Sequence, residues 1–284
     1  MLNTLNLNQF LNHYLQFGQQ LRNQVVVIKY GGAAMKNNDL KLKVIQDILF
    51  LYNLGIKLVL VHGGGPMIND WLNYLNIKPS FDKGIRITDA QTMEVVEMVL
   101  VGKVNKDLVN LINVYSDVGI GLSGKDANLL LASAMFPDSE NLVGKIDHVN
   151  TDILNLLLNS GYIPIIASVA SSKVGTTYNV NADTVASSIA QSLNADKLIL
   201  LTDTPGVLTD IHNTDTLQKL INVDTIQSLC QQNIIQGGMV PKVECCINAL
   251  HNNVASTHII DGRIEHALLY ELLTENRLGS QIII

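Results

Sequence analysis

The sequence predicts an α/β fold, a three-layer αβα sandwich in which helices cover both faces of a mainly parallel central sheet. Three observations indicate this fold. Short apolar runs such as Val25–Ile28 and residues 57–61 recur along the chain, and such runs are typical of strands buried on both faces. Glycine-rich turns follow these runs, and amphipathic stretches follow the turns, which is the order of βα units.

The composition is that of a chain with ample core material. Of 284 residues, 47% are hydrophobic and 15% are charged. This length allows either one large domain with two lobes or two small domains. The net charge of −6 argues against a nucleic-acid partner, which would require a basic patch. No apolar run approaches the roughly 18 residues of a membrane span, so we expect no membrane association.

Cysteine usage and the first residues bear on the compartment. Cys230, Cys245 and Cys246 are odd in number and two are adjacent, which fits neither a disulfide framework nor a metal ligand set. Reduced thiols indicate a reducing compartment. The first residues resemble neither a signal peptide nor a transit peptide. We therefore expect a cytoplasmic protein, or one of the plastid stroma if an organelle encodes it.

The first 22 residues predict an amphipathic helix, because apolar side chains recur there at three- and four-residue spacing. This helix precedes the first strand, and two interpretations are open: it packs on its own domain, or it buries its apolar stripe against another subunit. The stripe consists of Leu7, Phe10, Leu11, Tyr14, Phe17 and Leu21.

The first predicted strand, Val25–Ile28, runs into Lys29 and the glycine turn Gly31–Gly32. Most lysines solubilise a surface. A lysine at the carboxyl end of a buried strand, beside a glycine turn, favours a role facing a ligand. A helix over residues 40–54 follows.

The second strand, residues 57–61, runs into three glycines at 63–65, and Pro66 then begins a helix. Glycine lets a ligand lie against bare backbone, and the first N–H groups of a helix attract anions. The segment therefore predicts an anion cradle. A tight βα turn without a ligand is the alternative.

Residues 80–89 alternate, with Arg86 between two isoleucines; if the isoleucines face the core, Arg86 points to the opposite face. Such an arginine could form a bidentate contact with a carboxylate. A surface arginine on an edge strand is the alternative. Thr88 and Asp89 can cap a long helix over residues 90–114.

Residues 119–126 satisfy G-x-G-x-x-G and nearly satisfy the P-loop pattern, but both matches fail on context. Asp126 stands where a P-loop needs a hydroxyl for Mg²⁺, and the segment follows a helix instead of a strand. We expect a glycine-rich loop near a site, not the nucleotide cradle.

The middle of the chain predicts irregular or hairpin structure over 137–151 with Gly144 at the turn, a helix over 153–158 and a strand over 162–167. A second helix begins near residue 182 and runs through residue 189. Asn179 or Asn181 could cap it, but capping needs one such residue and three polar candidates are present. The third, Asp183, lies in the first turn and could hold a neighbouring lysine.

The last third predicts a strand over 197–202, a turn over 203–208 able to clasp an adenine or ribose, and a helix over 224–231. Another glycine turn then precedes Lys242 in the first turn of a helix. A lysine there opposes the helix dipole, so we expect an anion beside it. A helix over 265–273 lies between closing strands at 258–260 and 281–284.

Two lysines at glycine turns, an aspartate able to organise both and a triglycine cradle favour phosphoryl transfer, whose catalysis is mostly positioning and charge neutralisation. The described motifs contain no Ser-His-Asp or Cys-His pairing and no obvious general base. An already ionised acceptor, such as a carboxylate, needs no base. The residues alone thus indicate a kinase acting on a small anionic acceptor.

Seven segments, in order from about Val25 onward, resemble the amino acid kinase family. They are Val-Ile-Lys-Tyr-Gly-Gly, Leu-Val-His-Gly-Gly-Gly-Pro, Lys-Gly-Ile-Arg-Ile-Thr-Asp, Val-Glu-Met-Val-Leu-Val-Gly-Lys-Val-Asn-Lys, Gly-Leu-Ser-Gly-Lys-Asp-Ala, Tyr-Asn-Val-Asn-Ala-Asp and Gly-Gly-Met-Val-Pro-Lys-Val-Glu. The resemblance implies the amino acid kinase fold. It also implies phosphorylation of the γ-carboxylate of N-acetyl-L-glutamate by ATP, the second step of arginine biosynthesis.

The resemblance also assigns roles to residues. Mg²⁺ would be carried mainly by ATP, with no protein ligand. The chain would divide into an arm (1–22), a substrate-binding and dimerisation lobe (23–178) and a nucleotide-binding lobe (179–284). The implied residues are Lys29, Lys242 and Asp183 for catalysis; Gly64, Gly65, Arg86 and Asn179 for the substrate; and Gly31, Gly32, Thr202, Asp203, Gly206 and Leu208 for the nucleotide.

Family members with an extra N-terminal helix form hexamers, trimers of dimers, that arginine inhibits. The resemblance places the effector near Tyr14, His266, Glu271 and Gly279, and the PII signalling protein is kept as a further candidate partner. Two alternatives stay open. A carrier-linked aminoadipate kinase shares most motifs, although the context of Arg86 argues against it. A sensor of arginine or nucleotide without catalysis is opposed by the intact lysines and aspartate.

Overall fold

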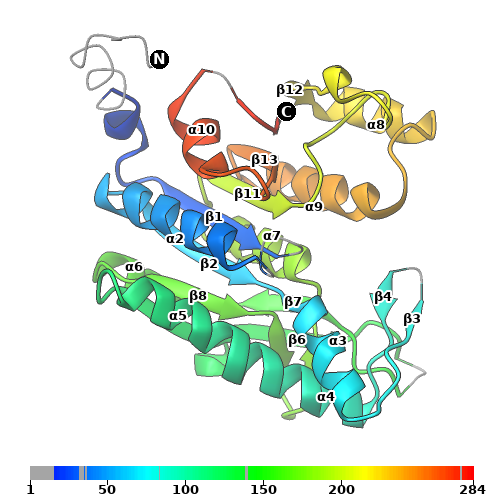
Figure 1. The fold of residues 1–284 in the computed structure, drawn as a ribbon. Helices are drawn as coiled ribbons and strands as arrows, with labels where there is room; N and C mark the ends of the chain where they lie inside the picture. Colours follow the sequence, from blue (N-terminus) through cyan, green and yellow to red (C-terminus); the bar gives the residue numbers. More distant parts are fainter. Residues whose placement is uncertain (1–15, 32–34, 36, 83, 138–139, 276) are drawn as a thin grey trace.

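The computed structural model describes residues 16–31, 35, 37–82, 84–137, 140–275 and 277–284. At its centre lies an eight-stranded sheet covered by helices (Figure 1), which confirms the predicted α/β class. Neighbouring strands are parallel except for one antiparallel pair near an edge, β13 with β14. In spatial order the strands are β12 (Leu220–Asn222), β14 (Ser280–Ile283), β13 (Ser256–Asp261), β11 (Lys197–Thr202), β1 (Val25–Tyr30), β2 (Lys57–His62), β8 (Ile163–Ala167) and β5 (Gly119–Ser123).

Two hydrophobic cores lie on the two faces of this sheet, because alternate side chains of a strand point to opposite faces. On β1, Val26 and Ile28 belong to one core and Val27 to the other. The first core is covered by α2 (Asn38–Asn53), α3 (Gly65–Tyr74), α4 (Ala90–Glu97), α5 (Asn105–Asn113) and α10 (Ala267–Leu273). The second is covered by α6 (Asp152–Asn159), α7 (Ala182–Ser192), α8 (Val223–Gln231) and α9 (Val240–His251).

A second sheet and a short hairpin stand beside the central sheet, and the sequence did not predict this sheet. Its order is β10 (Thr177–Asn179), β9 (Val169–Ser171), β6 (Leu130–Ala134) and β7 (Gly144–Val149), and the hairpin is β3 (Phe81–Asp82) with β4 (Ile85–Arg86). The predicted turn at Gly144 was wrong, since Gly144 opens β7. A Cβ there would lie 2.6 Å from the Cβ of Tyr178, so glycine permits the close approach of β10.

The predicted loop over 119–126 was also wrong in its first half. Residues 119–123 form β5, the edge strand that pairs in parallel with β8. Its glycines let α5 lie directly against it, because a Cβ on Gly119 would come within 3.0 Å of Asn113 Oδ1. Glycine lowers strand propensity, and here it serves a close contact instead.

The long helix predicted over 90–114 is present, but its middle is a π-helical stretch over Met98–Val104 that no local signal indicated. Asp89 caps it by accepting a 2.8 Å hydrogen bond from Thr92 N. Of the predicted N-terminal helix, residues 16–21 are described and helical, and Leu21 is buried in the first core. None of the helices in the described part of the chain combines the length and hydropathy that a bilayer crossing requires.

Candidate active site

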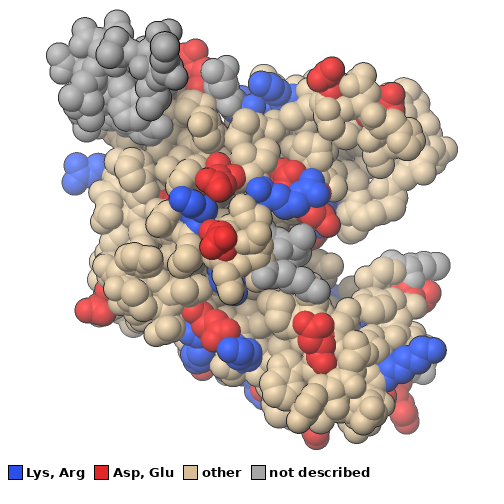
Figure 2. Space-filling model, viewed as in Figure 1, with Lys and Arg blue, Asp and Glu red and all other residues tan. Residues whose placement is uncertain are grey.

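The predicted glycine turns and lysines meet at one edge of the central sheet. Lys29 on β1 stands in register with Val61 on β2 and Leu200 on β11, so the carboxyl ends of these parallel strands coincide. Ligands of open α/β sheets bind at such edges. The space-filling view shows an indentation between the part that carries α8 and α9 and the part that carries the β3–β4 hairpin (Figure 2).

Two lysines hold opposite oxygens of one carboxylate. Lys29 Nζ forms an ion pair of 2.8 Å with Asp183 Oδ1, and Lys242 Nζ donates a hydrogen bond of 2.9 Å to Oδ2. Asn181 caps α7 by accepting from the N–H groups of Asp183 and Thr184, which leaves the Asp183 side chain free for the lysines. Asn179, the alternative cap, lies in β10 instead.

The charges in this cluster favour an ionised aspartate. Burial alone would raise the pKa of Asp183, but the nearby charges of Lys29 and Lys242 outweigh it and hold that pKa below its ordinary value. The side chains of all three residues are less than one-fifth exposed. One carboxylate against two ammonium groups leaves a net positive charge, which favours an additional anion. The sequence predicted an anion beside Lys242, because a lysine in the first turn of a helix opposes the helix dipole, and Asp183 supplies that anion.

The triglycine turn leaves two N–H groups available. Its carbonyls are engaged: His62 Nδ1 lies 3.0 Å from Gly63 O, Ile68 N donates to Gly64 O, and Arg86 Nη2 donates to Gly65 O. The N–H of Gly63 donates to Tyr30 O. Within the described residues, the N–H groups of Gly64 and Gly65 have no such acceptor. The turn is therefore built to present donors to a ligand.

Glycine at position 64 is also a packing requirement, since a Cβ there would lie 2.5 Å from the buried Leu100 Cδ2. At Gly63 a Cβ would lie 3.5 Å from the Cβ of Ala182. Ala182 precedes Asp183, so the turn borders the lysine–aspartate cluster.

Arg86 is a buried cation held by neutral groups. Its Nη2 donates to Asn69 Oδ1 at 2.6 Å and to Gly65 O at 3.3 Å, and the guanidinium lies 4.7 Å from the centre of the Phe81 ring. Only 8% of the residue is exposed, and burial lowers its pKa. Among the described residues, Nη1 has no hydrogen-bond partner and no carboxylate pairs with it. A buried unpaired charge is costly, which points to an anionic ligand.

Asn179 is linked to Arg86 through one hydroxyl. Asn179 Nδ2 donates to Thr88 Oγ1 at 3.1 Å, and Thr88 Oγ1 donates to the carbonyl of Arg86 at 3.1 Å. The two predicted substrate residues thus belong to one wall. The sequence suggested Thr88 only as a helix cap.

The predicted nucleotide residues lie at the ends of β1 and β11. A Cβ on Gly31 would meet Lys29 Nζ at 3.0 Å, so the glycine makes room for that lysine. Gly32 lies outside the described residues. Thr202 ends β11 and donates to Asp203 Oδ1 at 3.2 Å. Two further residues complete the turn: Gly206, whose φ of +141° favours glycine, and Leu208, which bridges to Leu217.

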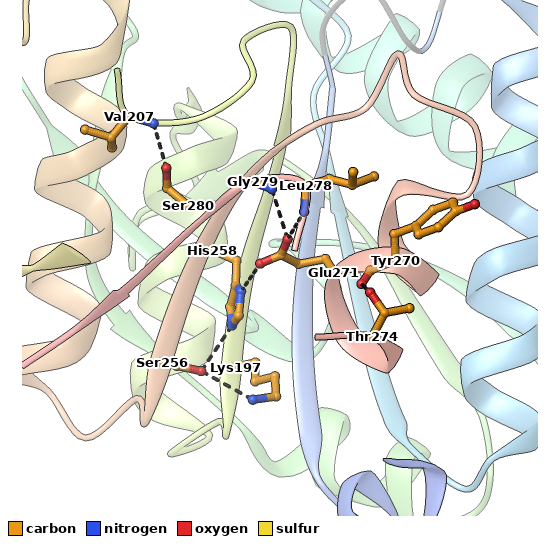
Figure 3. A network of polar contacts seen from close by, with 10 residues as sticks. All are labelled: Lys197, Val207, Ser256, His258, Tyr270, Glu271, Thr274, Leu278, Gly279 and Ser280. Atoms are coloured by element: carbon orange, nitrogen blue, oxygen red, sulfur yellow. Dashed lines mark hydrogen bonds and ion pairs between the residues drawn. The ribbon is translucent and has the colours of Figure 1, made fainter. Parts of the chain in front are cut away.

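Two of the predicted effector residues, Glu271 and Gly279, belong to a buried polar network at α10 (Figure 3). Glu271 Oε1 lies 2.8 Å from His258 Nδ1, and Oε2 accepts from the N–H groups of Leu278 and Gly279. Only 3% of Glu271 is exposed. In this conformation its carboxylate ties α10 to β13 and to the chain before β14. Tyr14 lies outside the described residues.

His266, the fourth effector candidate, pairs with a residue the sequence did not single out. Its Nδ1 lies 2.6 Å from Asp47 Oδ1 on α2. The backbone N–H groups of Leu268 and Leu269, in the first turn of α10, face the same carboxylate. Burial raises the pKa of Asp47 to about 6, although these donors and His266 oppose the rise.

Two further buried polar residues, His62 and Asn105, lie behind the triglycine turn. Nothing in the sequence around either residue distinguishes it from an ordinary core or surface residue, so sequence reasoning did not identify it. Burial lowers the pKa of His62 to about 4, so its ring is neutral at physiological pH.

The fold, the paired lysines and the donor-rich glycine turn are those of a small-molecule kinase. A sequence model of the amino acid kinase family matches residues 24–261, and the chain belongs to this family. Its relatives include the acetylglutamate kinase of Gracilaria tenuistipitata var. liui, 58% identical over the full length of both chains. The acetylglutamate kinase of Nostoc punctiforme is 50% identical over 96% of this chain and 92% of its own.

Among solved structures, N-acetylglutamate synthase from Neisseria gonorrhoeae shares the fold with a TM-score of 0.86 at 24% identity. The match covers 98% of this chain, which spans 63% of that protein.

Proposed function

We propose that this protein transfers the γ-phosphoryl group of ATP to the γ-carboxylate of N-acetyl-L-glutamate, giving N-acetyl-L-glutamyl 5-phosphate in arginine biosynthesis. Relatives that carry this activity in their names match it over nearly the whole chain. The structural observation that carries the proposal is the pair of lysines on one buried aspartate, beside the N–H groups of Gly64 and Gly65, which have no acceptor among the described residues.

In the transfer step an oxygen of the γ-carboxylate attacks the γ-phosphorus, and the bond from that phosphorus to the β,γ-bridging oxygen breaks. ADP leaves with the electron pair. The acceptor is already ionised, so no proton is removed and no general base is required. Lys29 and Lys242 offset the charge of the moving phosphoryl group, and Asp183 fixes their positions.

The acceptor would be held by the wall that carries Arg86 and Asn179. The guanidinium, which has no carboxylate partner among the described side chains, would take the α-carboxylate of acetylglutamate. Asn179 would donate its second amide hydrogen. Gly64 and Gly65 would direct their N–H groups at the phosphoryl group and the γ-carboxylate.

The nucleotide would lie against Gly31, Gly32 and the turn that contains Thr202, Asp203, Gly206 and Leu208. Membership of the family implies that ATP is used. Mg²⁺ would travel with the ATP phosphates and neutralise part of their charge; both oxygens of Asp183 already face lysines, so we assign it no ligand from this cluster. In this scheme residues 23–178 form the substrate and dimerisation lobe and residues 179–284 the nucleotide lobe.

Trapping the acyl phosphate with hydroxylamine tests the proposal. We expect hydroxamate formation that depends on ATP, Mg²⁺ and N-acetyl-L-glutamate, with little from free glutamate, which carries a cationic amine in place of the acetamide. Turnover only with a carrier-linked aminoadipate would support that alternative. No turnover with either acceptor, by protein that still binds ATP, would support a sensor.

The resemblance to the family also suggests how the enzyme is regulated. We propose a homohexamer, a trimer of dimers, in which the N-terminal arm with Tyr14 joins neighbouring dimers and arginine inhibits by binding near His266, Glu271 and Gly279. The apolar stripe of the arm supports this; its last two members, Phe17 and Leu21, pack on the core of their own chain. The relatives favour a plastid stroma or a cyanobacterial-type cytoplasm, with the PII signalling protein as a candidate partner.

A further inference from the structure

Asn105 of α5 and His62 at the end of β2 form a fully buried polar contact behind the glycine turn. Both residues have an exposed fraction of 0%. Asn105 Nδ2 lies 3.1 Å from His62 Nε2, 2.8 Å from Ile165 O and 3.3 Å from Leu122 O. The proposed transfer uses neither side chain directly, and burying two polar groups is unfavourable unless their hydrogen bonds are made.

The surroundings of Asn105 determine which nitrogen of His62 carries the proton. The carbonyls of Ile165 and Leu122 can only accept, so the group that faces them is the amide NH₂ of Asn105. His62 Nε2 faces the same NH₂, whose nitrogen cannot accept a hydrogen bond, so Nε2 does not carry the proton. In a neutral ring the proton is then on Nδ1, which donates to the carbonyl of Gly63 at 3.0 Å.

This hydrogen bond fixes a peptide plane. In a trans peptide the C=O and N–H groups point in opposite directions. Holding Gly63 O toward the buried His62 ring therefore turns the N–H of Gly64 away from the core. A peptide between two glycines rotates easily, because neither residue has a Cβ to restrict it. The orientation needs a second group to hold it.

Gly121 on β5 belongs to the same arrangement. A Cβ there would lie 2.0 Å from Asn105 Oδ1, so only glycine lets the amide lie flat against the strand. The second glycine of the misleading G-x-G-x-x-G segment thus has a structural use.

We infer that Asn105 and His62 are positioning residues that orient the Gly63–Gly64 peptide so that the N–H of Gly64 faces the transferring phosphoryl group. The inference rests on the proposed function, since it assigns the group that this N–H meets.

Nitrogen NMR of the histidine side chains in the wild-type protein gives a direct test. We expect His62 to carry its proton on Nδ1, with Nε2 unprotonated, at neutral pH. A proton on Nε2 would overturn the inference, whatever the enzyme phosphorylates. Absence of turnover with acetylglutamate would instead contradict the proposed function.

Kinetics of two matched variants give the second test. Asn105→Leu removes the amide that restrains His62. Asn113→Leu removes two hydrogen bonds of the same helix to the same strand, those of Asn113 with Gly119 N and O, without touching His62. We expect Asn105→Leu to lower kcat roughly 10- to 100-fold with little change in either KM, and Asn113→Leu to keep kcat. Equal losses in both variants, or an unchanged kcat in Asn105→Leu, would contradict the inference.

Gly121→Ala displaces the Asn105 amide, because the added methyl group on β5 would overlap it. This variant replaces Asn105→Leu if the latter does not fold. We expect a lowered kcat together with an altered His62 nitrogen signal. A changed signal with an unchanged kcat would show that the His62 tautomer does not set the catalytic geometry.

Discussion

Lys242 donates a 2.9 Å hydrogen bond to Asp183, a residue 59 positions earlier in the chain, and thereby fastens the first turn of α9 to the first turn of α7. The other oxygen of the same carboxylate pairs with Lys29. A single side chain thus sets the separation between two ammonium groups that come from opposite ends of the sequence.

Lys242→Ala should lower kcat roughly 10²- to 10³-fold, because it removes a charge that acts on the transferring group, while KM for ATP and acetylglutamate changes little. Steady-state kinetics measure both values. Lys103→Ala is the control, since Lys103 forms an exposed pair with Asp107. An effect of Lys242→Ala confined to KM would contradict its assigned role.

Asp183→Asn should destabilise the fold by about 3–5 kcal/mol at neutral pH, because the ammonium groups of buried Lys29 and partly buried Lys242 lose their counter-ion. The pKa of Asp183 is lowered in the folded state, so its stabilising contribution is present above the ordinary value of 3.8 and is lost as the pH falls through the folded-state value. Urea unfolding across pH should therefore show wild type and variant converging only in acid. A difference that stays constant below pH 3 would argue against the ionised carboxylate.

Arg86→Lys should raise KM for acetylglutamate roughly 10- to 100-fold and leave KM for ATP unchanged, because lysine keeps the charge but not the fork that binds a carboxylate with two hydrogen bonds. The matched control is Arg263→Lys, at a half-exposed arginine that pairs with Asp261. If KM for acetylglutamate is unaltered in Arg86→Lys, the α-carboxylate binds elsewhere.

Asp47→Asn should flatten the pH dependence of stability between pH 4 and 6. The pKa of Asp47 is raised to about 6, so the folded state binds the proton more tightly, and stability falls as the pH rises through this range. A rise from 3.8 to about 6 corresponds to at most about 3 kcal/mol. Urea unfolding at pH 4.5 and 7 measures the slope. Asp107→Asn, at an exposed position, should retain it; an unchanged slope in Asp47→Asn would refute the assignment.

Arginine should inhibit the full-length protein, and removing residues 1–15 should weaken that inhibition at least tenfold while the oligomer mass falls from hexamer to dimer. The shorter chain keeps Leu21, which is part of the core. Light scattering measures the oligomer mass, and reaction rates measured against arginine concentration give the strength of inhibition. Identical responses of both proteins would exclude residues 1–15 from the effector site.

Much of the sheet could be predicted because β1, β2, β8 and β11 contain short apolar runs next to turn residues, which are typical of strands covered on both faces. β5 escaped prediction because its glycines serve contacts with Asn105 and Asn113 that are invisible locally. In the second sheet, β9 and β10 have three residues each, which is too few to show a periodicity.

The lysines of the site could be predicted because a charge at a buried strand end or a helix N-terminus contradicts its local environment. No such conflict with the local sequence marks His62, Asn105 or Asp47. A lone histidine after a strand or an aspartate within a helix is ordinary until the fold buries it. The contact between the side chains of His62 and Asn105 spans 43 residues and that between Asp47 and His266 spans 219, so only the tertiary structure identifies these pairs.

The order of strands in the central sheet bears on how the chain is synthesised. β1 pairs with β2, and β8 and β5 then extend that side, so four strands can assemble once residue 167 has left the ribosome. The other edge of β1 stays bare until residues 197–202 emerge to form β11. An uncovered Val-Val-Val-Ile edge invites pairing with foreign strands. We therefore expect the nascent chain to be most prone to aggregation, and most dependent on chaperones, during the translation of α7.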